Sequence, residues 1–236
     1  MYSANPLPLA ISHRGLHAAA PENSIPAFLA AIEAGAEAIE LDVHASADDI
    51  LFVHHDAALV VGDDDHVPFT KLDSSRIADL RIDGDVAIPT LDDALAAIGS
   101  SCGVFIEIKA SGIENAVARC LRRQMSNAER YAVHAFDHRI VKRMLELIPS
   151  VRTGMLQVSY LIDSCAALRK GGAMDLWQHA DFVDAALVAD VHSCGGRVIA
   201  WTPNSEAQWS ALAKLGVDGI CTDNIEAYVA WKSATG

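Results

Sequence analysis

The sequence predicts an α/β fold of the (β/α)8 TIM barrel class. Along most of its 236 residues, short runs rich in β-branched and other apolar residues alternate with segments whose apolar residues recur at helical spacing. Eight such runs with helices between them match a barrel of parallel strands, whereas an open doubly wound sheet usually has about five or six strands. The glycine-rich turn of dinucleotide-binding sheets is also missing from the sequence.

Eight short runs are predicted to form the strands. Each is apolar enough to be buried in a parallel sheet that is covered by helices. The sixth is very short. The runs are Leu9–Ser12, Ala38–Val43, Val104–Ile108, Tyr131–Ala135, Arg152–Leu156, Phe182–Val183, Arg197–Trp201 and Gly219–Cys221.

Helices are predicted between most of these strands. The first, Ser24–Ala34, follows Asn23, a residue type that is favoured as an N-cap. Thr90 and Asp93 resemble a capping box for Leu91–Ile98, with Asp in place of the usual Glu. The other predicted helices are Glu114–Gln124, Arg139–Leu147, Ala185–Ser193, Glu206–Lys214 and Ile225–Lys232.

One segment breaks the alternation and is predicted to be a small insertion after the second strand. It runs from about residue 57 to residue 87, contains the acidic cluster Asp63–Asp65 and shows no sustained helical period. This length is too great for an ordinary barrel loop. We interpret the segment as an excursion that starts with the extended run Ile50–His54; the alternative is a disordered loop. Residues 1–236 are otherwise predicted to form a single barrel domain.

The composition disfavours nucleic acids and anionic membranes as partners and favours a cytoplasmic location. Asp and Glu outnumber Lys and Arg by 31 to 18, which gives a formal net charge of −13. Nucleic acids and anionic membrane surfaces are therefore poor partners. The five cysteines form no CxxC pair, which predicts reduced thiols and favours the cytoplasm. We find no secretory signal and no apolar stretch of about 18–20 residues that could span a bilayer, and the oligomeric state stays open.

Polar side chains stand at strand ends where a barrel interior is expected to be apolar. Glu40 and Asp42 are two residues apart, so on a strand they point to the same face, and Glu107 and Lys109 share a face in the same way. Their strand neighbours are apolar and can pack against helices. These four side chains are therefore expected to project into the barrel, near the end where barrel active sites form.

Inward carboxylates repel one another unless they take up protons or hold a cation. Glu40, Asp42 and Glu107 offer only oxygen ligands, which suit one hard divalent cation, Mg²⁺ or Ca²⁺, better than Zn²⁺. Two other interpretations stay open at this point. The carboxylates can form a salt-bridge network with Lys109 and Arg14, or a pair of them can hydrolyse a glycoside.

Histidines favour phosphate chemistry over glycoside hydrolysis. His13 ends the first strand, and alternation turns only one of His54 and His55 towards the same site, so two imidazoles can act as acid and base. Arg14, with its planar guanidinium, and Lys109 can hold a phosphate. A hard cation, two imidazoles and two cationic side chains suit a phosphate ester better than a sugar acetal. Five other histidines are expected at the surface: His17, His66, His138, His179 and His192.

A series of short motifs occurs in order along most of the chain, from about residue 11 to residue 223. The motifs are HRG at 13–15, PENS at 21–24, ELDV at 40–43, HD at 55–56, IPTL at 88–91, EIK at 107–109, WTPN at 201–204 and DGICTD at 218–223. Any one of them alone is weak, but the ordered set is specific. It strongly resembles the glycerophosphodiester phosphodiesterase family.

The resemblance implies roles for nine residues. It implies a barrel with a small insertion after the second strand and one divalent cation, Mg²⁺ or Ca²⁺, as cofactor. Glu22 would lie at the edge of the site, and Trp201 would form a wall near the glycerol or the leaving group. The implied roles are metal ligation by Glu40, Asp42 and Glu107, acid–base catalysis by His13 and His55, and substrate binding by Arg14, Lys109, Glu22 and Trp201.

The activity implied by the resemblance is metal-dependent hydrolysis of a small-molecule glycerophosphodiester to sn-glycerol 3-phosphate and an alcohol. The sequence departs from the family pattern at Ser24, where Thr is usual, and at the end of the fourth strand, where Ser-Phe is usual and this chain has His134-Ala135-Phe136-Asp137. The second departure removes a hydroxyl, so the substrate preference stays open. One alternative is a phospholipase D-like enzyme acting on lysophospholipids or sphingomyelin, which the lack of a membrane-binding apolar segment disfavours. Another is a barrel that binds phosphate metabolites without turnover, which the intact histidine pair disfavours.

Overall fold

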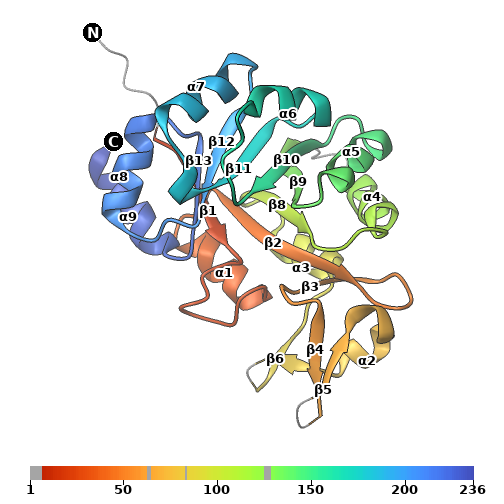
Figure 1. Ribbon diagram of the computed structural model, residues 1–236. Helices are drawn as coiled ribbons and strands as arrows, with labels where there is room; N and C mark the ends of the chain where they lie inside the picture. The colour runs from red at the N-terminus through yellow and green to blue at the C-terminus, as the bar shows by residue number, and fades with distance from the viewer. Residues whose placement is uncertain (1–6, 63–64, 83, 125–128) are drawn as a thin grey trace.

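The computed structural model describes residues 7–62, 65–82, 84–124 and 129–236. Its centre is a closed ring of eight parallel strands (Figure 1), which confirms the predicted (β/α)8 barrel. The first and second strands of the chain pair with each other and close the ring. In ring order the strands are β1 (Leu9–His13), β13 (Gly219–Thr222), β12 (Arg197–Trp201), β11 (Asp175–His179), β10 (Arg152–Gln157), β9 (Tyr131–Ala135), β8 (Gly103–Ile108) and β2 (Ala38–Ala45).

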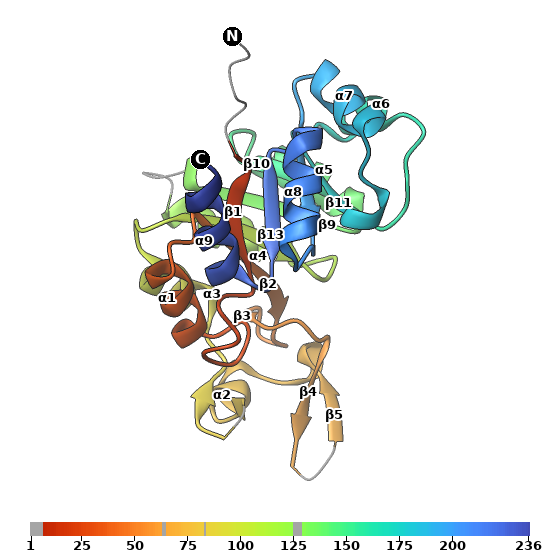
Figure 2. The same ribbon diagram turned by 90° about the vertical axis from the view of Figure 1, so that its left-hand side faces the viewer.

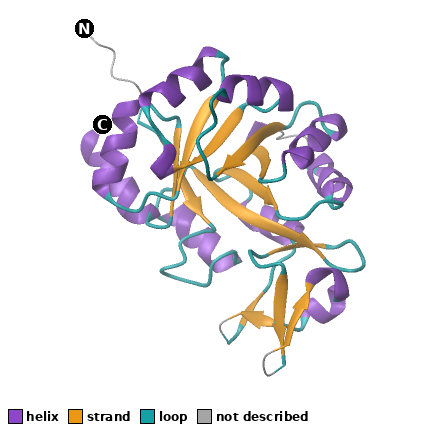
Figure 3. Cartoon of the chain, in the orientation of Figure 1, coloured by secondary structure: helices purple, strands orange, loops and turns teal. Residues whose placement is uncertain are grey.

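Helices surround the ring of strands, as Figure 3 shows. Their apolar faces and the outward-facing strand residues form one large hydrophobic core. Within the described ranges, none of the helices is long and apolar enough to cross a lipid bilayer. The helices of the ring are α1 (Ile25–Glu33), α3 (Leu91–Ile98), α4 (Glu114–Arg123), α5 (His138–Leu147), α6 (Ser164–Gly171), α7 (Ala185–Ser193), α8 (Glu206–Leu215) and α9 (Ile225–Thr235).

The sixth strand of the barrel lies earlier in the chain than predicted. The prediction placed it at Phe182–Val183, whereas the structure has β11 at Asp175–His179, followed by a single 3₁₀ turn at Ala180–Phe182. Most of the β11 sequence, DLWQH, is polar, yet Asp175 and Gln178 are fully buried. The hydrophobic pattern missed this strand because two of its buried positions hold polar side chains. The hydrogen-bond partners of these side chains lie elsewhere in the barrel. Helix α6 is likewise absent from the prediction.

The first helix is capped by Ser24 and not, as predicted, by Asn23. Ser24 is extended, and its hydroxyl accepts a hydrogen bond from a backbone N–H in the first turn. Asn23 has φ 57°, and its side chain forms hydrogen bonds with Asp42. The predicted cap of α3 is confirmed, because the Thr90 hydroxyl accepts a hydrogen bond from the backbone N–H of Asp93.

The chain between β2 and α3 folds into a small segment outside the ring. Its elements are β3 (Leu51–Val53), β4 (Ala58–Val61), β5 (Asp65–Pro68), η1 (Phe69–Lys71), α2 (Ser74–Ala78), β6 (Arg81–Ile82) and β7 (Val86–Ala87). Strand β3 runs antiparallel to the end of β2, and β4, β5 and α2 extend beyond one end of the ring (Figure 2). The segment has its own apolar cluster, formed by Phe52, Leu59, Phe69, Leu72, Ile77 and Ile88.

Asp175 ties three neighbouring strands together at their N-terminal ends. Its side chain is fully buried at the start of β11. The carboxylate accepts hydrogen bonds of 2.7–2.9 Å from the guanidinium groups of Arg152 on β10 and Arg197 on β12. Because this end of a barrel is remote from the catalytic end, the cluster is expected to contribute to stability and not to chemistry.

We expect Asp175→Ala to lower the free energy of unfolding by about 3 kcal/mol, because it leaves two partly buried guanidinium groups without a counter-charge. Urea denaturation measures the loss. Glu146→Ala is the control; it breaks an exposed ion pair with Arg143 and is expected to cost less than about 1 kcal/mol. Equal losses in the two variants would contradict this role for Asp175.

Candidate active site

A cavity of about 200 Å³ opens at the C-terminal end of the ring. Most of the site residues predicted from the sequence line it, namely His13, Arg14, Glu40, His55, Glu107, Lys109 and Trp201. The other two, Glu22 and Asp42, do not line the cavity, but both contact Arg14, which does. The Arg14 guanidinium pairs with both of them, at 3.0 Å from each carboxylate.

The register of the sheet explains why these side chains meet. Across the β1–β2 pairing His13 lies opposite Glu40. Across the next pairings Asp42 lies opposite Glu107, and Glu107 lies opposite His134. Because side chains on one face of a strand recur every second residue, all five point towards the same end of the barrel interior.

Glu40 and Glu107 form a buried group with His134, to which the sequence analysis assigned no role. Each of the three offers one ligand atom, and these atoms lie within 4.8 Å of one another. The His134 Nε2 atom is 3.6 Å from a carboxylate oxygen of Glu40. His134 also stacks on the Trp177 ring at 4.2 Å between ring centroids. An imidazole thus lies beside the two buried carboxylates.

Asp42, the third predicted ligand, is held by cations and an amide. Its carboxylate lies 3.0 Å from Arg14 Nε and 3.3 Å from Lys109 Nζ, and Asn23 Nδ2 donates a hydrogen bond to it at 2.8 Å. Lys109 also pairs with Glu107 at 2.9 Å. The salt-bridge network that the sequence left open is therefore present, and it includes two of the three predicted metal ligands.

The charges of this cluster do not balance. Burial, reinforced by the charge of Asp42, raises the pKa of Glu40 and of Glu107 to about 7 each. Burial also acts to raise the pKa of Asp42, but Lys109 and Arg14 outweigh it and hold that pKa below its ordinary value. Three carboxylates thus face two cationic side chains.

The same cluster fits a divalent cation. Among the described residues, Glu40 Oε2 is a buried oxygen without a hydrogen-bond partner. Burial lowers the pKa of His134 to about 4, so a neutral imidazole adds no positive charge near neutral pH. An excess of buried carboxylate charge and an oxygen with free lone pairs are what a hard cation requires.

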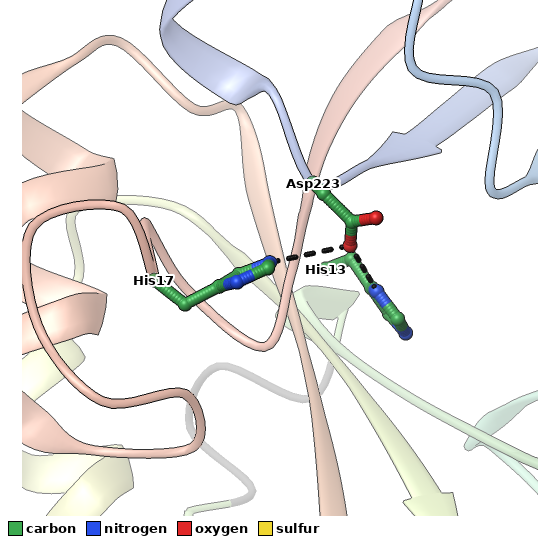
Figure 4. A group of neighbouring side chains, drawn as sticks. All are labelled: His13, His17 and Asp223. Carbon is green, nitrogen blue, oxygen red and sulfur yellow. Dashed lines mark hydrogen bonds and ion pairs between the residues drawn. The ribbon is translucent and has the colours of Figure 1, made fainter. Parts of the chain in front are cut away.

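His13 is fixed by Asp223, which the sequence analysis left without a role (Figure 4). His13 Nδ1 lies 2.6 Å from Asp223 Oδ1, and His17 Nε2 lies 3.2 Å from the same oxygen. The amide of Asn204 donates to the other carboxylate oxygen at 2.6 Å. With Nδ1 donating to Asp223, Nε2 of His13 remains available as a base; it lies 4.0 Å from Glu40 Oε2.

His55 lies between β3 and β4, outside the ring of strands, and lines the cavity. Its Nδ1 atom is 2.8 Å from Asp56, and its backbone carbonyl is 3.1 Å from Nε2 of His44. The ring of His44 stacks on Phe69 at 5.1 Å. His54, the other candidate of the pair, contacts Phe69 instead, at 5.7 Å between ring centroids. The small segment outside the ring therefore helps to place His55.

The opposite wall of the cavity is aromatic. The Trp201 indole packs edge to face with Phe136 at 5.7 Å and with His179 at 5.2 Å, and its N–H donates to the backbone carbonyl of Trp177. His179 and His17 were both expected at the surface. The structure corrects this, because both are partly buried. His179 ends β11 and contacts Trp201, and His17 lies in a turn after β1 and contacts Asp223. His138, which was also expected at the surface, is partly buried as well.

Comparisons with known proteins relate the chain to one family. Residues 13–227 match the glycerophosphoryl diester phosphodiesterase family. The Bacillus subtilis protein YhdW is 30% identical over 232 residues, which cover 90% of this chain and 93% of that protein. A glycerophosphodiester phosphodiesterase from Caldanaerobacter subterraneus subsp. tengcongensis is 29% identical, over 94% of this chain and 96% of its own length.

Solved structures share the fold. An Oleispira antarctica phosphodiesterase in complex with the product sn-glycerol-3-phosphate has a TM-score of 0.85 and 23% identity, covering 96% of this chain and 97% of that one. A glycerophosphodiester phosphodiesterase from Agrobacterium tumefaciens has a TM-score of 0.82 and 24% identity, with 95% and 100% covered. At these identities the likeness shows the fold alone. The family match over residues 13–227 and the near-complete overlap with YhdW show that the chain belongs to the glycerophosphoryl diester phosphodiesterase family.

Proposed function

We propose that this protein hydrolyses glycerophosphodiesters to sn-glycerol 3-phosphate and an alcohol, with histidine acid–base catalysis and a divalent cation. The observation that carries the proposal is that His13 and His55 line one cavity together with Glu40, Glu107 and cationic side chains. Family membership and the named activity of the Caldanaerobacter relative support it. The product complex of the Oleispira antarctica relative is consistent with the same substrate class.

The two histidines divide the proton transfers between them. One accepts the proton of the attacking glycerol hydroxyl, and the other protonates the alcohol that leaves the phosphorus. The resulting cyclic phosphate is opened by water with the histidine roles reversed. His13 is prepared for this work because Asp223 fixes its Nδ1–H and leaves Nε2 free. A positioned general acid or base contributes about 10²–10⁴-fold in rate.

Arg14 and Lys109 stabilise the charge on the phosphate oxygens. Both line the cavity, and both are held in place before substrate binds, Arg14 by Glu22 and Asp42, and Lys109 by Asp42 and Glu107. Cations that are already oriented need no reorganisation in the transition state, which makes them effective in a partly buried site.

Glu40, Asp42 and Glu107 are the residues that would hold the cation, and their oxygens suit Mg²⁺ or Ca²⁺. When bound, the ion supplies charge compensation for the phosphate and polarises a phosphoryl oxygen. His134 belongs to the same buried group, and its neutral imidazole can accept or donate one hydrogen bond there.

We expect EDTA to lower the rate of glycerophosphocholine hydrolysis by about 100-fold or more, because an electrostatic stabiliser of the transition state is lost. Excess Mg²⁺ or Ca²⁺ restores the rate, and the better of the two identifies the preferred ion. EDTA that is saturated with metal beforehand is the control. Full activity in free EDTA would remove the metal from the proposal while leaving the histidine chemistry intact.

A further inference from the structure

His13, His17 and Asp223 form a group in which two imidazole nitrogens converge on one carboxylate oxygen beside the cavity (Figure 4). Each residue offers one potential metal ligand, and the three ligand atoms lie within 4.8 Å of one another. Among the described residues, the only other such group is the buried carboxylate group that contains His134. Of the three residues, His13 alone lines the cavity. We call the three residues the imidazole group.

The backbone brings the two histidines together in a fixed turn. Three residues separate His13 from His17, a spacing that is common in zinc sites. Gly15 within the turn has φ 85°, and a Cβ atom at this position would lie 2.8 Å from the backbone of Ala27, so the turn packs directly against α1. The backbone N–H of Leu16 also donates to the carbonyl of Ala27 at 2.9 Å. The two imidazoles therefore stand on an anchored turn.

The carboxylate of Asp223 is oriented by groups other than the histidines. In the pairing of β1 with β13, Ser12 lies opposite Thr222, so the residues that follow, His13 and Asp223, leave the two strands side by side. Asn204 Nδ2 donates to Asp223 Oδ2 at 2.6 Å, and Asn204 Oδ1 accepts the backbone N–H of Asp223 at 2.9 Å. Hydrogen bonds of this kind orient the ligands of metal sites, and they leave Oδ1 facing the two imidazoles.

Two imidazole nitrogens and one carboxylate oxygen suit Zn²⁺ better than Mg²⁺ or Ca²⁺. Zinc binds such atoms at about 2.0–2.2 Å, which places tetrahedral ligand atoms roughly 3.4 Å apart. His13 Nδ1 and His17 Nε2 lie 2.6 Å and 3.2 Å from Asp223 Oδ1, so the side chains reach this geometry by shifts of about 1 Å. Their exposed fractions are 20% for His13 and 31% for the other two, so an ion reaches them from solvent.

We propose that the imidazole group binds one Zn²⁺ and that this ion inhibits hydrolysis. The site is separate from the site of the hard cation, because Nδ1 of His13 faces Asp223, whereas Nε2 lies 4.0 Å from Glu40. An imidazole that binds a metal through Nδ1 carries its ring proton on Nε2. His13 then has no lone pair with which to accept a proton, and each histidine accepts one proton in the proposed reaction. The inhibition rests on the proposed function, whereas the binding of Zn²⁺ does not.

Calorimetric titration with Zn²⁺ measures the site directly. The protein is kept in an excess of Mg²⁺ or Ca²⁺, whichever activates better, so that the buried carboxylates are occupied. One Zn²⁺ per chain is expected. His17→Gln keeps a hydrogen-bond donor for Asp223 but removes the imidazole, and it is expected to weaken binding about 100-fold or more, because loss of a group that only orients a ligand already costs about 10–100-fold. Equal affinity in the wild type and His17→Gln, or no binding, overturns the inference.

The matched control is His192→Ala. His192 also pairs with an aspartate, because its Nε2 atom lies 2.8 Å from Asp218, and it is 40% exposed. This pair belongs to neither group of potential ligands in the described chain, and Asp218 precedes β13 at the opposite end of the barrel. The affinity of His192→Ala for Zn²⁺ is expected to be that of the wild type.

Hydrolysis of glycerophosphocholine in the same excess of Mg²⁺ or Ca²⁺ tests the inhibition. Saturating Zn²⁺ is expected to lower the wild-type rate by about 10²-fold or more, the lower end of the contribution of a general acid or base, and a further tenfold excess of the activating ion is expected not to restore it. His17→Gln, compared with its own rate without Zn²⁺, is expected to need about 100-fold more Zn²⁺ for the same inhibition, and His192→Ala is expected to behave like the wild type.

The competing explanation is that Zn²⁺ displaces the activating ion from the buried carboxylates. Inhibition that extra Mg²⁺ or Ca²⁺ relieves, and that is equal in the wild type and His17→Gln, supports this explanation and overturns the inference. Binding of Zn²⁺ by the imidazole group without loss of rate overturns the inhibitory role. Failure to hydrolyse any glycerophosphodiester in the absence of Zn²⁺ overturns the proposed function and the inhibition with it, whereas calorimetry of His17→Gln still decides whether the metal site exists.

Discussion

Replacing His13 with alanine is expected to lower kcat for glycerophosphocholine by about 10³-fold, the middle of the range for a positioned general acid or base. Asp223 and the register of β1 leave Nε2 of this imidazole free near Glu40, and the described residues around the cavity include only one other imidazole outside the buried carboxylate group, that of His55. Steady-state kinetics with saturating substrate measure the change.

The matched control for this variant is His66→Ala, at an exposed position in the segment outside the ring, which is expected to keep the wild-type kcat. His55→Ala is expected to resemble His13→Ala, because each histidine serves once as acid and once as base. Circular dichroism checks that the variants fold. A loss of less than tenfold in folded His13→Ala would show that proton transfer by this residue is not required.

Glu40→Gln is expected to reduce activity by about 10²–10³-fold through loss of charge at the cation site. The same substitution is expected to raise the stability of the metal-free protein at high pH. The carboxyl group of Glu40 is buried, and its pKa is raised from 4.5 to about 7. A group whose pKa is raised on folding favours the folded state below its unfolded pKa, and that contribution is lost as the pH rises through the folded pKa. The metal-free variant is therefore expected to be at least as stable as the wild type at pH 8, with an advantage that disappears towards pH 5.

Steady-state kinetics measure the loss of activity, and thermal unfolding at pH 5 and pH 8, with and without metal, tests the expected change in stability. Saturating Mg²⁺ or Ca²⁺ is expected to stabilise the wild type, by about 2.7 kcal/mol at 100 times the dissociation constant, and to stabilise Glu40→Gln much less. Glu33→Gln, at an exposed position on α1, is the control and is expected to respond to metal like the wild type. An equal metal response in Glu40→Gln would place the cation elsewhere.

The sequence was sufficient to predict the barrel because strand and helix periodicities are local properties. It failed at β11, where Asp175 and Gln178 replace apolar side chains in a buried strand. Their burial is tolerated because Asp175 accepts hydrogen bonds from arginines on neighbouring strands and Gln178 Nε2 donates to backbone carbonyls. A single-sequence pattern does not show those partners. Helix α6 was missed for a different reason, because it is short and has charged residues in its last turn.

For the site, alternation correctly brought Glu40 and Glu107 to the cavity, but the roles of the nine named residues stay predictions. Spacing shows which side chains face inwards, and it left the salt-bridge network with Lys109 and Arg14 as one open interpretation. The place of the His134 imidazole beside these carboxylates emerged only from the register of neighbouring strands. Asp223 closes the DGICTD motif, which was the one available signal for its importance, yet its contact with His13 spans 210 positions of sequence.

That long-range contact has a consequence for biosynthesis. His13 stands on the first strand of the ring in chain order, and the carboxylate that orients it follows the last strand of the ring, which pairs with β1. A growing polypeptide therefore cannot complete this pair of proton-transfer groups until β13 has been synthesised and has paired with β1. Catalytic competence thus reports closure of the ring, and partially synthesised chains carry His13 without the partner that orients it.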